Sequence, residues 1–244
     1  ASRLVQGAWT VNPTSARERE QHYRFLASLY LRPPSGALLR ALRDGSILPA
    51  SRGAPGDEDP GRGGEATTPA LDLEELVSEA RGRPDLGEEL EAEHAALFVL
   101  PSGVIPHEAF YGDREQRLGG RVTIAVERFY RNAGIHILDR CIEMPDHVGI
   151  ELEFMAALCR LEADLGEAGD PAARGRCVGL QRTFLEEHLA RWAPACCERV
   201  IALARYGFYK AIARFTTEFL RSEQAHLGVG HAEGARRCEP AQRC

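Results

Sequence analysis

The spacing of apolar residues is the feature that most restricts the fold of this 244-residue chain, because it follows the helical period. Tyr23, Leu26 and Tyr30 recur three and four residues apart, and similar stripes continue as far as Leu220. No run shows the alternation of apolar and polar residues that is typical of a half-buried strand. The pattern therefore predicts an all-α, single-domain helical bundle.

Local signals predict where several helices begin and end. Ser15 followed by Glu18 forms a capping box, so a helix is expected to start there. Asp170 followed by Pro171 is expected to cap the start of another helix. Residues 146–165 are apolar on two faces, which predicts a helix at the centre of the bundle. Gly207 lies within the segment 194–220, which is therefore either one bent helix or two.

Stretches rich in glycine, proline and charge interrupt the helical pattern. Residues 44–70 and the tail 228–244 contain few large apolar side chains, so neither is expected to order by itself. We expect one helical domain over residues 15–227, with a disordered insertion at 44–70 and flexible ends at 1–14 and 228–244. Residues 101–120 are predicted to form a loop, because glycine and proline recur there.

Composition and charge exclude several functional classes. The chain is 44% hydrophobic and 27% charged, which is typical of a globular protein. Its formal net charge of −6 argues against a nucleic-acid partner. The seven cysteines include no C-x-x-C pair, and no segment approaches the roughly 20 apolar residues of a membrane span. We expect a cytoplasmic protein with reduced thiols and no stable membrane insertion.

One candidate site lies at the start of the predicted central helix. At helical spacing His147, Glu151 and Met155 share a face, and Asp146 lies at or next to the N-cap. Such a face could attract a cationic peptide, hold a proton donor or bind a metal. An imidazole beside carboxylates would titrate near neutral pH. The alternative is purely structural, with an N-cap aspartate and a Glu–His pair that satisfy each other.

A second candidate site lies in the predicted loop. Glu108 follows a proline and precedes Phe110 and Tyr111, so a carboxylate there could bind the polar end of a ligand beside an aromatic wall. The alternative is a loop that only buries two aromatic side chains in the core.

Two Glu-x-x-His pairs, Glu91–His94 and Glu223–His226, suggest a different class of protein. Helical bundles that hold two irons use two such pairs, because residues i and i+3 project inward together. The chain would then be a di-iron carboxylate oxidase or oxygenase. Further ligands could come from glutamates on other helices, namely Glu18, Glu127, Glu151 and Glu153.

Several motifs, taken in order, resemble the TorD/DmsD/NarJ family of cytoplasmic chaperones for molybdenum enzymes. Residues 93–98 (EHAALF) resemble its E-x-x-x-L-F element, and residues 106–111 (PHEAFY) resemble its P-x-E-S-x-Y element, with Ala109 in place of serine. Residues 145–155 (PDHVGIELEFM) are similar to its D-H-x-x-x-E-L-x-F-M signature. Residues 184–192 (FLEEHLARW) look like part of its C-terminal helices.

The resemblance implies an all-helical, non-catalytic chaperone without a cofactor of its own. Its partner would be the apo catalytic subunit of a molybdenum enzyme, bound through the N-terminal leader while the molybdopterin cofactor is inserted. It would also delay twin-arginine export where that subunit is exported. The family allows a monomer or a homodimer. We therefore expect a shared peptide-binding groove lined by Glu108, Phe110, Tyr111, Asp146, His147, Glu151 and Met155. A helical adaptor unrelated to molybdenum remains a third possibility.

Overall fold

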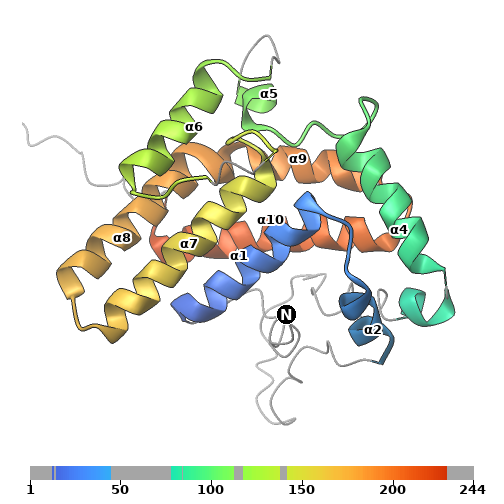
Figure 1. Cartoon of the computed structure of the whole chain (residues 1–244), viewed down its shortest axis with the longest axis horizontal. Helices are drawn as coiled ribbons and strands as arrows, with labels where there is room; N and C mark the ends of the chain where they lie inside the picture. Colours follow the sequence, from blue (N-terminus) through green and yellow to red (C-terminus); the bar gives the residue numbers. More distant parts are fainter. Residues whose placement is uncertain are drawn as a thin grey trace, which may run out of the picture.

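The computed structural model describes residues 13, 15–44, 78–83, 85–112, 118–137 and 142–229, and Figure 1 shows how these segments pack into a helical bundle. No strand forms within these ranges, which confirms the predicted all-α class. The elements are α1 (Ala16–Leu31), α2 (Gly36–Asp44), α4 (Leu86–His94), the π-helical turn η1 (Ala95–Val99), α5 (Glu108–Gly112), α6 (Arg121–Asn132), α7 (Val148–Glu167), α8 (Pro171–Phe184), the π-helical turn η2 (Leu185–Leu189), α9 (Ala190–Leu203) and α10 (Gly207–Leu227).

The predicted helix ends agree with the structure where both can be compared. Ser15 and Glu18 form the expected capping box at the start of α1. The Asp170 side chain accepts a hydrogen bond from the Ala173 N–H and caps α8. The stretches expected to be flexible lie almost entirely outside the described residues, although Asp44 is the last residue of α2 and Gly228 caps α10 in the left-handed conformation.

Helix α7 is central, as predicted, and lies between α1 and α8 (Figure 1). Its first turn approaches α1 closely at Gly149. A Cβ added there would lie 2.5 Å from Leu31 Cγ, so only glycine allows this approach without displacing Leu31. The beginning of α7 is therefore held firmly against the end of α1.

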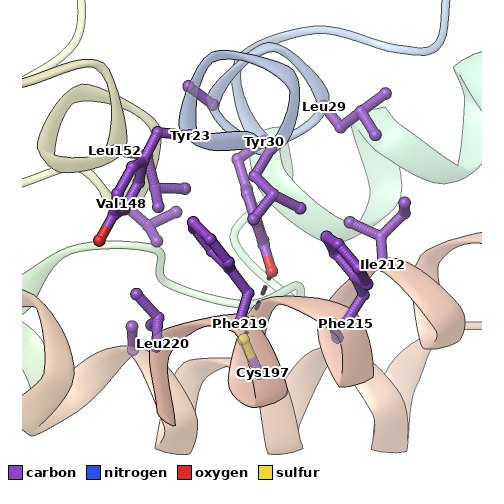
Figure 2. Packing of buried hydrophobic residues seen from close by; sticks show 14 of the residues in the cluster. Tyr23, Leu29, Tyr30, Val148, Leu152, Cys197, Ile212, Phe215, Phe219 and Leu220 are labelled. Atoms are coloured by element: carbon purple, nitrogen blue, oxygen red, sulfur yellow. Dashed lines mark hydrogen bonds between the residues drawn. The ribbon is translucent and has the colours of Figure 1, made fainter. Parts of the chain in front are cut away.

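The core beneath α1 is built from aromatic and aliphatic side chains, as Figure 2 shows. Tyr30 extends from α1 toward α9, where its hydroxyl lies 3.4 Å from Cys197 Sγ and also donates to Thr216 at 3.1 Å. Phe219 of α10 packs edge-on against Tyr23 with ring centroids 4.7 Å apart. Each buried aromatic side chain of this size contributes several kcal/mol of hydrophobic stabilisation, about 3–5 kcal/mol by truncation to alanine.

The segment 194–220 forms two helices that separate at residues 204–206. Glu93 of α4 stabilises the break, because its Oε1 accepts hydrogen bonds from the N–H groups of Arg205 and Tyr206. Pro194 lies inside α9 and does not mark a boundary.

A buried ion-pair network, which we call the Arg19 cluster, joins α1, α7, α8 and α10. The Arg19 guanidinium donates to both oxygens of Glu223 at 2.7–2.9 Å, to Glu162 at 3.0 Å and to the Gln181 side chain at 2.6 Å. All four residues are buried. Because a buried charge is tolerated only when it is paired and hydrogen-bonded, this network fixes how the four helices meet.

None of the described helices combines the length and the apolar character that a membrane span requires.

Candidate functional site

The two candidate segments predicted from the sequence meet through their main chains. Residues His107 and His147 form an isolated antiparallel bridge. The Glu108 N–H donates to the Asp146 carbonyl, and the Val148 N–H donates to the Pro106 carbonyl, both at 2.9 Å. The start of α5 is thereby fixed beside the start of α7.

The prediction of a loop throughout residues 101–120 is wrong at its centre, because Glu108–Gly112 form the short helix α5. Asp146 explains why a helix starts there. One oxygen of its carboxylate, Oδ2, accepts a hydrogen bond from the Ala109 N–H at 3.0 Å. Sequence alone could not supply this cap, since Asp146 lies far from Ala109 along the chain.

Asp146 therefore lies next to the N-cap of α7 but caps a different helix. The N-cap of α7 is His147, whose Nδ1 accepts a hydrogen bond from the Gly149 N–H at 3.0 Å. Burial raises the pKa of Asp146, but His107 and the Ala109 N–H outweigh it and hold that pKa below its ordinary value. Asp146 is therefore an anion at neutral pH.

His147 does not behave as the sequence suggested. Burial, together with the neighbouring His107, lowers the pKa of His147 to about 3. The expectation that His147 titrates near neutral pH is therefore wrong, because the ring is neutral there and is already used as a helix cap. The predicted Glu–His pair of the structural alternative is also absent, because Glu151 bonds elsewhere.

Glu151 is paired with a residue that the sequence did not assign to the site. Trp192 of α9 donates its indole N–H to Glu151 Oε2 at 3.1 Å. The other oxygen, Oε1, has no hydrogen-bond partner among the residues that the structure describes. Burial first, and then the nearby Glu108 carboxylate, raise the pKa of Glu151 well above its ordinary range. Glu151 therefore favours its neutral acid form.

Glu108 also gains an unexpected partner, His188 of η2. His188 Nδ1 lies 2.9 Å from Glu108 Oε2, and both side chains remain about one-tenth exposed, at 11% and 10%. The rings of Phe184 and Phe129 pack against His188, with centroids 5.1 Å and 5.7 Å away. We call Glu108, Asp146, Glu151, His188 and Trp192 the carboxyl cluster.

The π-helical turn η2 brings His188 to this cluster. Such turns occur frequently at functional sites in proteins. His188 and Trp192 were not predicted as site residues, although both lie in the 184–192 segment that resembles the family. That resemblance is the only sequence signal that could have found them.

Two aromatic residues of the predicted site lie beside the carboxyl cluster. Tyr111 stacks on Trp192 with ring centroids 5.4 Å apart, and Phe110 meets Tyr111 edge-on at 5.2 Å. Both are half-buried, and Arg199 lies over the Phe110 ring at 5.6 Å. Phe110 and Tyr111 thus provide an apolar margin next to the acids.

Met155 is fully buried within the hydrophobic core. It shares the helical face of Glu151, but its apolar side chain belongs to the core. The expectation that Met155 lines a peptide-binding surface therefore does not agree with this structure.

The di-iron alternative is wrong. Glu223 is bound to Arg19, while Glu91 and His226 are exposed, so the two Glu-x-x-His pairs do not share a site. Among the described residues, one group with metal-ligand chemistry was found, His107, Glu143 and His147. Because His147 Nδ1 accepts the α7 cap bond, its neutral ring carries the proton on Nε2 and offers no free lone pair there.

Comparison with known proteins places these residues in a family. A model of the nitrate reductase delta subunit family matches residues 64–198, more than half of the chain, and this range includes the whole carboxyl cluster. The chaperone protein TorD of Vibrio cholerae (strain M66-2) is 25% identical over 154 residues, which cover 62% of this chain and 68% of TorD.

Two further relatives are named for the enzymes whose assembly they serve. The chlorate reductase assembly chaperone of Ideonella dechloratans is 35% identical over 138 residues, covering 54% of this chain and 68% of that protein. The selenate reductase assembly chaperone of Thauera selenatis is 36% identical over 126 residues, covering 49% and 64%. The chain therefore belongs to the nitrate reductase delta subunit family, and the relatives that it matches are named as chaperones, not as catalytic enzymes.

Proposed function

We propose that this chaperone binds the N-terminal leader of the apo catalytic subunit of a molybdenum enzyme. Binding takes place in the cytoplasm while the cofactor is inserted, and it delays twin-arginine export where the client is exported. The observation that carries this proposal is the carboxyl cluster, where three acids from two segments meet beside an aromatic margin. The names of the relatives, which serve reductase assembly, support it.

The chemistry of a twin-arginine leader matches this arrangement. Two guanidinium groups would meet the acids, and the apolar run that follows would pack on Phe110 and Tyr111. Asp146 Oδ1 and Glu151 Oε1 are buried without hydrogen-bond partners in the described part of the chain. Buried acceptors of this kind are costly, so a ligand rich in N–H donors gains by satisfying them.

The test is the affinity for a synthetic leader peptide in which two adjacent arginines precede an apolar run. The double variant Asp146→Asn, Glu151→Gln removes the charge of Asp146 and the ionisable group of Glu151, but it keeps at each position an oxygen that can accept from Ala109 or Trp192. Calorimetry should show a loss of more than about tenfold in affinity, which corresponds to about 1.4 kcal/mol.

The matched control is Glu153→Gln, which removes an exposed acid from the same helix. Its affinity should equal that of the parent protein. If the double variant has a native circular dichroism spectrum and still binds the peptide with parental affinity, the carboxyl cluster is not the binding site.

A further inference from the structure

Glu151 is the one acid of the carboxyl cluster that has no imidazole beside it among the described residues. Glu108 has His188 at 2.9 Å, and Asp146 has His107, with Nδ1 at 3.7 Å from Oδ1. Glu151 receives only the neutral indole of Trp192. Two ionised carboxylates close together in a site shut off from water repel strongly, so one of them carries a proton.

Among the described residues, no arginine or lysine side chain is bonded to Glu151. The groups near it are Glu108 from α5, Tyr130 from α6, Asp146 from the segment before α7, and Trp192 and Cys196 from α9, and Arg199 of α9 lies near Cys196. Burial raises the pKa of Tyr130 and that of Cys196, so both are neutral. His188 of η2 is bonded to Glu108.

We propose, on the basis of the leader-binding function above, that one arginine of the leader places its guanidinium at the Glu108–Glu151 pair and displaces the proton that Glu151 carries in the free protein. The step breaks the O–H bond of the neutral acid, leaves the electron pair on the carboxylate and releases one proton to water. A charge-assisted contact with the guanidinium replaces the O–H group.

A guanidinium suits this position better than an ammonium does. Its planar fork presents five donors, so it can donate to more than one carboxyl oxygen at once. A lysine side chain is a compact, strongly hydrated point charge and does not present such a fork. The partial exposure of Glu108 and His188 gives the site an edge at the surface.

Proton displacement has a measurable consequence for affinity. When a ligand releases one proton on binding, its affinity rises by up to about tenfold for each unit of pH, as long as the free protein holds that proton. The leader should therefore bind more tightly at about pH 8 than at about pH 6. Replacement of Glu151 by glutamine should make the affinity independent of pH over this range.

The decisive experiment counts protons by calorimetry at about pH 7 in two buffers with different ionisation enthalpies. The probe is the twin-arginine peptide described above, acetylated at its N-terminus and free of histidine and cysteine, so that the peptide itself does not titrate. The parent protein should release close to one proton for each peptide bound. Glu151→Gln should release almost none, while Glu153→Gln should behave like the parent. A peptide with two lysines should bind more weakly and release fewer protons.

The outcomes separate this inference from the proposed function. Binding by the parent protein without proton release overturns the inference and leaves leader binding intact. Release that persists in Glu151→Gln also overturns it, because the proton then comes from another group. No binding of either peptide overturns the proposed function itself. If Glu151→Gln does not fold, the inference is tested by the number of protons that the parent protein and Glu108→Gln release on binding the peptide.

Discussion

The Arg19 cluster and the carboxyl cluster are both buried groups of acids, yet only the first is complete. In the Arg19 cluster a guanidinium from the chain itself donates to Glu162 and Glu223, and Gln181 adds a further contact. In the carboxyl cluster no arginine or lysine of the described residues pairs with the acids, and two carboxyl oxygens lack partners there. Both clusters thus bury acids, but only the carboxyl cluster leaves carboxyl oxygens without a hydrogen-bond partner.

The pKa shifts of one acid from each cluster show the same contrast. Burial raises the pKa of Glu162, but hydrogen bonds from Gln181 and Arg174 and the charge of Arg19 outweigh it and hold that pKa below its ordinary value. Glu151 lacks such partners, and its pKa lies well above the ordinary range. In the proposed complex, a leader arginine supplies to Glu151 what Arg19 supplies to Glu162.

The largest expected effect comes from breaking the complete cluster. Arg19→Met leaves Glu223 buried without its cation and Glu162 with Arg174 alone, and it should reduce the free energy of unfolding by about 3–5 kcal/mol, as measured by urea denaturation. Arg24→Ala, at an exposed position on the same helix, should change it by less than about 0.5 kcal/mol. A loss below about 1 kcal/mol for Arg19→Met would show that the cluster is not needed for stability.

Removing one acid from the complete cluster should have a smaller effect. Glu162→Gln weakens charge-assisted contacts with Arg19 and Arg174 and should cost about 1.5–3 kcal/mol near neutral pH. Because the folded pKa of Glu162 is depressed, its stabilisation is present above the unfolded value and is lost as the pH falls through the folded one. The free energy of unfolding of the variant should therefore fall less on acidification than that of the parent protein. If both fell equally, the pKa of Glu162 would not contribute to the pH dependence of stability.

His147 should contribute through its cap and not through its charge. His147→Ala should cost about 1 kcal/mol, while His147→Asn, which restores an acceptor at the N-cap, should recover most of it in thermal unfolding. Because the folded pKa of His147 is lowered to about 3, its neutral ring stabilises the protein above the unfolded pKa, and this contribution is lost as the pH falls below that value. Equal stabilities for the alanine and asparagine variants would contradict a capping role.

The smallest effect on stability is expected at the incomplete cluster. Glu151→Gln replaces a neutral acid by a neutral amide and should change the free energy of unfolding by less than about 0.5 kcal/mol near neutral pH. The folded pKa of Glu151 is raised, so its contribution is present below the unfolded value and is lost as the pH rises through the folded one. Chemical denaturation at rising pH should therefore show the parent, but not the variant, losing this contribution. A large loss near neutral pH would make Glu151 a structural residue like Glu162.

Local patterns were sufficient to predict several of the helices, although they missed α5. The capping box at Ser15, the cap at Asp170 and the two-faced apolar pattern of 146–165 each predicted an element that the structure confirms. These signals work because helix formation depends on neighbours within one turn of the chain.

The sequence also identified Glu108, Asp146 and Glu151 as residues that would meet, but it did not identify their partners. Only tertiary packing decided that Asp146 caps α5, that His147 caps α7, and that His188 and Trp192 complete the cluster. The physical reason is that helical spacing fixes which side chains share a face, whereas the hydrogen bonds and the pKa of a buried group depend on what lies across that face. The residues across that face belong to helices that are distant along the chain.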